Sequence, residues 1–182
     1  MRKVGVDVEN PFMSKGEDDF SYFKMLDLVP LYSIDMATLE KHYIQKQRLF
    51  HPDRFVLSSE AEQLEAHHRT TCLNEAYRVL KSPYLRGQHI LACMEHETGQ
   101  HFEYSPTSLF LMEMMEAQEK IMSFKEESDK DKMALDLKIR RRALEEQVVT
   151  AFDVKEYQRA ADYLGQIRYL DQLSKAVRDK EI

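Results

Sequence analysis

A histidine, a proline and an aspartate stand together at residues 51–53, where their side chains could bind a metal, move a proton or form a recognition loop. Imidazole and carboxylate groups are metal ligands, and His67 and His68 follow nearby, but the sequence has neither a His-x3-His spacing nor a cysteine pair. An acid–base pair would need a nucleophile, a glycine-rich phosphate loop or a pocket of paired carboxylates, and no such motif accompanies the triplet. Metal binding and catalysis are therefore the weaker interpretations.

The proline also makes this triplet a helix boundary. Pro52 disfavours the α conformation of His51, so the helical pattern over 36–50 must end there, and a second helical pattern runs over 60–80. His51 and Asp53 are thereby predicted to lie on a short loop between two helices. The loop is either a recognition element at the tip of a helical hairpin or a plain helix stop, with Asp53 capping the next turn.

The predicted helix before the loop has two faces. Its larger apolar residues share one stripe, which should pack on neighbouring helices: Met36, Leu39, Tyr43 and Phe50. Lys41 and Arg48 fall on the opposite face, and Lys46 near the stripe should extend its amine towards water. The spacing alone leaves two roles open for Lys41 and Arg48, namely solubilising charge or a docking surface.

The composition narrows the class of protein. The 182 residues include 26 basic and 32 acidic side chains, and the net charge of −6 disfavours nucleic acid as the main partner. No apolar run approaches the length of a membrane span, and no apolar segment of a secretory signal follows the first residues. Cys72 and Cys93 form no CxxC pair, which indicates a reducing compartment and small buried side chains rather than metal ligands.

The chain is predicted to be all-α, because no segment alternates apolar and polar residues for long enough to read as a strand. Residues 1–18 are polar and expected to be disordered, and a short first helix should run over 19–26. Ser82 and Pro83 have the residue types of an N-cap and a first helical position, so they should open a fourth helix that ends near residue 94.

The second half of the chain reads as a helical bundle. A polar connection with one glycine covers 95–105, and helical patterns follow at roughly 107–128, 130–151 and 155–179. Their lengths and short connections predict an antiparallel three-helix bundle. A run of arginines at 140–142 is interpreted as solvated helix surface.

The first helix of this bundle has more apolar residues than one core face needs. One stripe explains its packing: Phe110, Met114, Ala117, Ile121 and Phe124. Three large apolar residues lie off that stripe and are flanked by two acids: Leu111, Met112 and Met115, with Glu116 and Glu119. Tyr169 on the last helix is a similar remainder, opposite Ala160, Leu164 and Ile167. An exposed apolar patch with a charged rim predicts an interaction site, and the alternatives are a bundle that buries both faces or a dimer contact.

Taken in order, these features resemble the HscB family, the J-domain co-chaperones of iron–sulfur cluster assembly. The triplet between two helices is similar to the J domain itself. Further segments that resemble the family lie at 19–23, 28–35, 73–86, 110–113, 160–162 and 167–173. Their order and spacing over 19–178 favour this family over J-proteins in general, although a J-protein with a different client and a helical scaffold without a chaperone partner remain alternatives.

The resemblance implies a J domain over 19–94, a connection over 95–105 and a three-helix bundle over 106–182, joined in an L shape. It also implies a non-enzymatic protein without a cofactor, in the bacterial cytoplasm. Residues 1–18 have no counterpart in the short bacterial members and lack the paired cysteines of the zinc-binding extension in animal members, so no metal site is expected.

The resemblance assigns one partner to each half of the chain. In the first half, five residues would contact the DnaK-class chaperone HscA and stimulate its ATPase: His51, Pro52, Asp53, Lys41 and Arg48. In the second half, six residues would bind the iron–sulfur scaffold protein IscU: Leu111, Met112, Met115, Glu116, Glu119 and Tyr169. Cluster transfer to recipient proteins would follow, with neither nucleic acid nor membrane involved.

Overall fold

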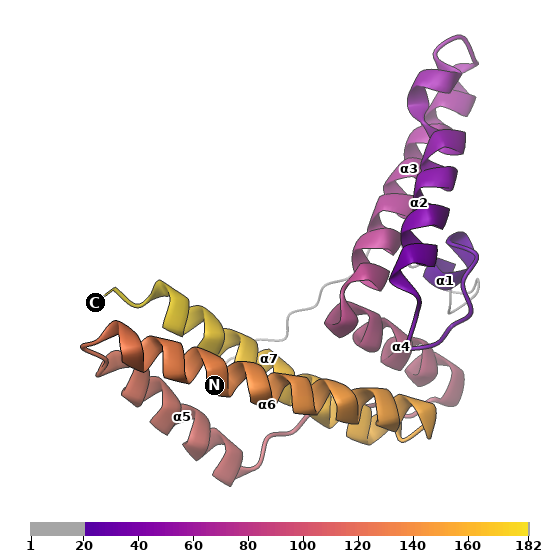
Figure 1. Ribbon diagram of the computed structural model, residues 1–182. Coiled ribbons are helices and arrows are strands. Elements are labelled where there is room, and N and C mark those ends of the chain that lie inside the picture. Colours follow the sequence, from indigo (N-terminus) through magenta and orange to yellow (C-terminus); the bar gives the residue numbers. More distant parts are fainter. Residues whose placement is uncertain (1–20, 182) are drawn as a thin grey trace, which may run out of the picture. The chain divides into compact units, whose positions relative to one another are not determined.

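The computed structural model describes residues 21–181, which form seven α-helices, one 3-10 helix and, within that range, no strand (Figure 1). The all-α prediction is therefore confirmed, whereas the expected tail at 1–18 lies outside the described residues. The chain divides into two compact units, one of residues 21–30 and 35–81 and one of Leu31–Ile34 and 82–181. Within the described chain, no helix combines the length and apolarity that a membrane span requires.

The first unit is a helical hairpin with a short helix beside it. Helices α2 (Met36–Phe50) and α3 (Glu60–Lys81) run side by side in opposite directions, and α1 (Ser21–Met25) packs on α3 (Figure 1). The unit's most deeply buried side chains come from these three helices and the turn after α1: Phe23, Leu26, Leu39, Leu73, Ala76 and Leu80. The predicted stripe of α2 is confirmed at Leu39, but Met36, the first residue of the helix, is 42% exposed, so the packed stripe is shorter than expected.

Short-range sequence signals set where the helices of the hairpin and the next helix begin. The carboxylate of Asp35 caps α2 by accepting from two backbone N–H groups of the first turn. Ser59 and Glu62 form a reciprocal capping box before α3, with the Ser59 N–H donating to Glu62 at 2.9 Å. Ser82 is the N-cap of α4 (Pro83–Thr98), and Pro83 takes the first position, as predicted.

Two helix ends differ from the prediction. Helix α4 continues past residue 94 to Thr98, and Gly99 ends it with a left-handed φ of 69° and an N–H that donates to the Glu95 carbonyl. Helix α5 (Ser108–Met122) stops well before 128, because the chain turns after Met122 to bury Phe124. Both ends depend on a turn geometry that the helical periodicity does not carry.

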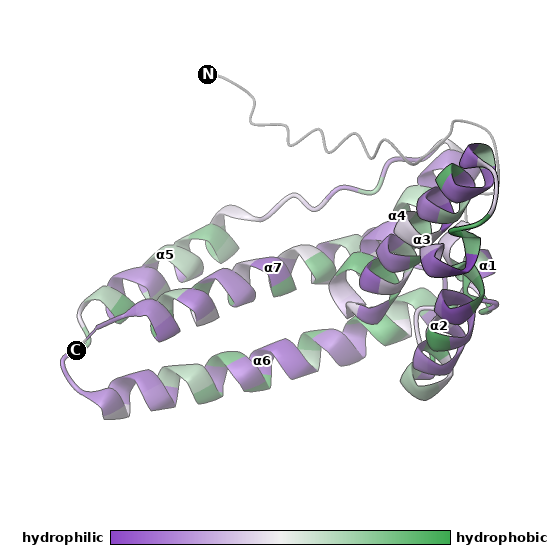
Figure 2. Ribbon diagram, turned by 90° about the horizontal axis from the view of Figure 1, so that it is seen from above, coloured by the Kyte–Doolittle hydropathy of each residue, from purple (hydrophilic) through white to green (hydrophobic). Residues whose placement is uncertain are grey.

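The second unit is the predicted three-helix bundle with α4 added to it. Helices α5 and α6 (Glu127–Asp153) both pack on α7 (Tyr157–Asp179), and so does α4 (Figure 2). One end of the bundle has a core drawn from the three long helices and the α5–α6 turn: Met114, Ile121, Phe124, Leu137, Leu170, Leu173 and Val177. The contacts thus group α4 with the bundle, whereas the J domain was expected to reach residue 94, and that functional boundary stays a prediction, as does the L shape.

The arginine run on α6 is only partly the solvated surface that was predicted. Arg140 and Arg142 are exposed and pair with acids on their own helix. Arg141 instead reaches α7, where its Nε donates to Asp171 at 2.8 Å, and so it helps to align the two helices.

A buried aromatic stack holds Leu31–Ile34, which belong to the second unit, against α6. The ring of Tyr32 stacks on Phe152 with 4.6 Å between centroids, and the buried guanidinium of Arg86 lies 5.2 Å from the Tyr32 centroid. This cation–π contact offsets part of the cost of burying the charge. Gly87 leaves room for Leu164, because a Cβ on Gly87 would lie 2.7 Å from a Leu164 methyl carbon. The absence of that side chain lets α4 and α7 pack closely.

Burial of His89 on α4 should make stability depend on pH. Burial lowers the pKa of this imidazole from 6.5 to about 4. Below pH 6.5 the unfolded chain gains a proton that the folded chain does not take up until about pH 4. The free energy of unfolding should therefore fall as the pH falls through that window, by up to about 3 kcal/mol. Urea unfolding at several pH values measures the loss.

A pair of variants identifies the group responsible. His89→Gln should flatten the dependence on pH, because its side chain does not titrate, whereas His96→Gln, at an exposed position of the same helix, should leave it unchanged. If wild-type protein and His89→Gln lose stability in parallel between neutral pH and pH 5, the effect belongs to another residue.

Candidate functional sites

The first candidate site is the loop at the tip of the α2–α3 hairpin (Figure 1). His51 ends α2 with φ −58° and ψ 127°, the extended conformation that a following proline favours. Pro52 then begins a short 3-10 helix, η1 (Pro52–Phe55). The side chains of His51 and Asp53 are 50% and 84% exposed, so the loop presents both groups to solvent.

The ring of His51 has two alternative contacts with the same residue. Its Nδ1 lies 3.3 Å from the backbone nitrogen of Asp53 and 3.4 Å from the Asp53 carboxylate. Nδ1 accepts from the backbone N–H only without a proton and donates to the carboxylate only with one, so the proton selects between the contacts. The cap of η1 is thus His51 and not Asp53, contrary to the helix-stop interpretation, and the Asp53 carboxylate remains exposed.

Other side chains fix the loop to both helices through backbone carbonyls. Arg54 donates to the carbonyl of Arg48 at 3.2 Å, and Thr70 on α3 donates to the carbonyl of Phe50 at 2.9 Å. The amide of Gln63 donates to two carbonyls just after η1. Because these contacts do not use the His51 side chain, replacing that side chain should leave the loop in place.

The proposed docking face of α2 is exposed, as its helical spacing predicts. Lys41 and Arg48 both lie on the solvent side of the helix. The opposite side is fixed to α3 by the stacked rings of Tyr43 and Tyr77, whose centroids are 4.0 Å apart. Lys46 is turned instead towards the chain after α1, where its amine pairs with Asp27 at 2.8 Å. Lys46 therefore has a structural role, whereas Lys41 and Arg48 are exposed.

The second candidate site is the apolar patch of α5, defined here as Leu111, Met112 and Met115. Their side chains are 37%, 58% and 64% exposed, while Met114, Ile121 and Phe124 of the core stripe are buried. The two predicted faces of this helix are therefore confirmed, although Phe110 and Ala117 are only partly buried. Glu116 and Glu119 are exposed beside the patch.

Two exposed apolar residues of α5 were missed in the sequence. Leu109 is 68% exposed and Met122 is 71% exposed. Met122 follows Met115 by seven residues, which places it on the same side of the helix. The signal was therefore present in the spacing, and the exposed apolar residues of α5 extend beyond the three of the patch.

Tyr169 is not the free aromatic that its helical angle suggested. It is half-buried in a cluster of three rings, with 5.5 Å to Phe110 and 6.1 Å to Tyr104 between centroids. Tyr104 in turn covers Gly165 so closely that a Cβ on this glycine would overlap the ring. Burial, reinforced by Tyr169 and Asp162, raises the pKa of Tyr104 to about 12. Tyr169 is thereby tied to the base of α5 through Phe110.

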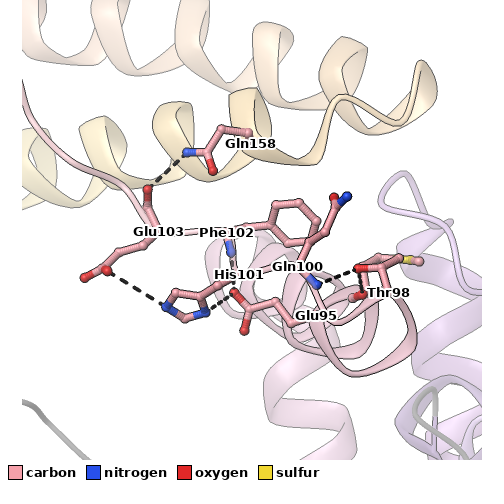
Figure 3. Close-up of polar contacts among 8 residues, drawn as sticks. Glu95, Thr98, Gln100, His101, Phe102, Glu103 and Gln158 are labelled. Atoms are coloured by element: carbon pink, nitrogen blue, oxygen red, sulfur yellow. Dashed lines mark hydrogen bonds and ion pairs between the residues drawn. The ribbon is translucent and has the colours of Figure 1, made fainter.

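The connection that carries Tyr104 is held on both sides (Figure 3). On the α4 side, the Phe102 N–H and His101 Nδ1 contact the Glu95 carboxylate at 2.6 and 2.9 Å. On the α7 side, the amide of Gln158 donates to the carbonyl of Glu103 at 3.0 Å. These contacts immediately precede Tyr104, so they fix the position from which its ring reaches α7.

The cysteines lie as expected inside helices. Cys93 is buried on α4 and Cys72 is partly buried on α3, each about one helical turn from a histidine, with sulfur–nitrogen distances of 3.8 Å. Over residues 21–181 the structure contains no cluster of three or more His, Cys, Asp or Glu that could hold a metal ion.

The effect of Gly165→Ala on stability should change sign when the Tyr104 side chain is removed. In the wild-type chain Gly165→Ala should lower the free energy of unfolding by about 1–3 kcal/mol, because the new methyl group overlaps the ring. In a Tyr104→Gly background, which removes both the ring and the Tyr104 Cβ that would lie 2.5 Å from the new methyl group, the same change should raise it by up to about 1 kcal/mol, because alanine favours a helix over glycine. Denaturant unfolding of the four proteins measures the coupling, and equal effects in both backgrounds would contradict the contact.

Comparison with known proteins gives matches along most of the chain. A family model described as the HSCB C-terminal oligomerisation domain matches residues 107–178. The co-chaperone protein HscB homolog of Psychromonas ingrahamii is 32% identical over 159 residues, which cover 82% of this chain and 90% of that protein. The human iron–sulfur cluster co-chaperone protein HscB is 29% identical over 161 residues, which cover 88% of this chain and 68% of that protein.

The folds agree as well as the sequences. The crystal structure of human co-chaperone protein HscB superposes with a TM-score of 0.78 at 27% identity, covering 91% of this chain and 82% of that one. The chaperone HscB from Vibrio cholerae gives a TM-score of 0.75 at 25% identity, covering 86% of this chain and 94% of that one.

Proposed function

Because this chain belongs to the HscB family, we propose that it is a co-chaperone of iron–sulfur cluster assembly. It holds the scaffold protein IscU on the α5 patch, presents it to the DnaK-class chaperone HscA and stimulates the ATPase of that chaperone through the loop at His51–Asp53. Cluster transfer to recipient proteins follows. The proposal rests above all on one chain carrying an exposed His-Pro-Asp loop in one unit and an exposed apolar patch in the other.

At the loop, this chain supplies recognition and its partner supplies the chemistry. The exposed carboxylate of Asp53 can accept hydrogen bonds from a cationic group of the chaperone, and His51 beside it offers a ring nitrogen as donor or acceptor. Lys41 and Arg48 add positive charge on the outer face of the adjoining helix, which suits an acidic surface. ATP hydrolysis then takes place on the chaperone, so this chain is not itself an enzyme.

At the patch, burial of apolar surface supplies the affinity. Leu111, Met112 and Met115 expose flexible or branched side chains that a partner can cover, and methionine adapts its shape to the surface it meets. Glu116 and Glu119 at the rim favour a partner with basic residues around an apolar centre. Tyr169 supports the patch from α7 through its contact with Phe110.

Removing the patch should weaken binding and leave the fold intact. Truncation of Leu111, Met112 and Met115 together to alanine should cost several kcal/mol of binding to the scaffold, at about 1–2 kcal/mol for each side chain. The melting temperature should change little, because these side chains are exposed. Calorimetric titration with IscU and a melting curve measure the two effects.

An equivalent truncation elsewhere on the bundle is the control. Leu135 and Ile139 on α6 are 59% and 61% exposed, and their change to alanine should leave scaffold affinity unchanged. Normal binding by the triple variant, or a melting temperature as low as that of a core mutant, would show that the wrong face of α5 was chosen. Stimulation of the chaperone by a wild-type chain that does not bind IscU would instead support a J-protein with another client.

His51→Gln should remove stimulation of the partner ATPase without unfolding the protein. The side chain is half-exposed, and the loop is fixed by carbonyl contacts that do not use it. Steady-state ATP hydrolysis by HscA, with IscU present, should return to the unstimulated rate. His67→Gln, at an exposed position of α3, should stimulate normally. Undiminished stimulation by the His51 variant would refute the assignment of the loop.

A further inference from the structure

A recess in the bundle lies next to Tyr169. This cavity of about 420 Å³ is walled by α4, by the connection before α5 and by α7. Its floor consists of apolar and aromatic residues: Leu91, Phe102, Tyr104, Leu164 and Gly165. A recess with such a floor suits an apolar side chain from another molecule.

The walls of this cavity are fixed rather than formed by a loose segment. Tyr104 lies against Gly165, and Phe102 packs on Tyr157 of α7 with 5.6 Å between centroids. The backbone just before Tyr104 is tied to Glu95 through the Phe102 N–H and to Gln158 through the Glu103 carbonyl (Figure 3). Because these contacts hold the floor and one wall in place, an incoming side chain meets a preformed surface and pays little ordering entropy.

The rim of the cavity indicates the charge of its occupant. Among the lining residues that the structure describes, Arg168 is the one cation, and it stands beside the hydroxyl of Tyr84. Gln88 donates to that hydroxyl at 2.7 Å, while Gln172 is exposed on α7. The carboxylate of Glu103 is directed to His101, 3.8 Å away, and is 80% exposed. A guanidinium with neighbouring neutral donors suits a carboxylate.

The cavity continues the patch of α5. Tyr169 lines the cavity and also packs edge-to-face on Phe110, and Leu111 of the patch follows Phe110 directly. Phe110 therefore lies between the cavity, which Tyr169 lines, and the patch, which begins at Leu111. A larger cavity of about 580 Å³ lies between α5 and α6. Several acidic and several basic side chains border it, so its charge favours neither an acidic nor a basic partner.

We propose that the cavity beside Tyr169 is a second anchor point of the scaffold-binding surface. The scaffold protein inserts one apolar side chain into this cavity beside the Tyr104 ring, and an acidic group of the same segment pairs with Arg168. The inference rests on the proposed function, since it names the scaffold as the occupant. It adds Arg168, Gln172 and the connection before α5 to a surface that the sequence placed on α5 and Tyr169 alone.

Two substitutions at the exposed rim test this anchor without touching the core. Gln172→Trp should fill the mouth of the cavity with an indole ring, and Arg168→Glu should place a carboxylate where the partner's carboxylate binds. Each should weaken IscU binding by at least about tenfold in calorimetric titration, the loss typical of one hot-spot contact. Melting temperatures should stay close to the wild-type value.

Matched changes on α6 serve as controls. Gln147→Trp and Arg142→Glu introduce the same side chains at exposed positions outside this cavity and should leave affinity within about twofold. The chain contains no tryptophan, so the emission of each new indole reports its own surroundings. The indole at 172 should emit at shorter wavelength than the one at 147.

The outcomes separate this inference from the proposed function. If both rim variants bind IscU normally while the triple alanine variant of the patch does not, the anchor is wrong and the proposed function stands, whatever the indole emission shows. If the wild-type chain itself fails to bind IscU, the proposed function is wrong and the anchor falls with it. Weaker binding by both rim variants, with normal binding by both controls, supports the anchor.

Discussion

The close approach of Tyr104 to the backbone of α7 at Gly165 is the constraint on which the second unit depends. An aromatic ring fits there only because residue 165 has no side chain. The ring holds the connection on α7, and α5 begins four residues later, where Phe110 meets Tyr169. With that end of α5 fixed, the core stripe faces α7 and the patch is left exposed. A glycine on one helix thus helps to determine which side of another helix is exposed to solvent.

The first unit solves a different problem, which is to present a short loop without making the loop part of the core. Its helices are joined by stacked aromatic rings, by the Lys46–Asp27 ion pair and by a hydrogen bond from Tyr43 to Asn74 at 3.0 Å. The loop is attached through backbone carbonyls, which leaves the His51 and Asp53 side chains to solvent. The contacts that attach the loop to the helices therefore use neither of these side chains, and we expect both to tolerate substitution without loss of the fold.

The sequence predicted what depends on near neighbours and missed what depends on distant ones. Pro52 sets the loop, Ser82-Pro83 sets the start of α4, and the spacing of α5 separates core from patch, all within a few residues. The setting of Tyr169 could not be read in the same way, because Tyr104 lies 65 residues earlier and helical angles describe only one helix at a time. The ends of α4 and α5 were missed because the chain turns at Gly99 and after Met122, and helical periodicity does not record where a turn falls.

The stack of Tyr32 on Phe152 has a consequence for how the chain acquires its fold during synthesis. The α2–α3 and α6–α7 hairpins join residues that are near in sequence, and such contacts form early and fast. The stacking partner of Tyr32, in contrast, is Phe152, which lies 120 residues further along the chain. Phe152 is near the end of α6, so it is synthesised after every helix except α7 has been completed or nearly completed. The segment Leu31–Ile34 therefore reaches its final place only after the hairpin that follows it has formed. Until Phe152 is in place, the Tyr32 ring lacks its stacking partner and the Arg86 guanidinium lacks the buried ring that it contacts. A nascent chain at that stage exposes aromatic surface to its cellular environment.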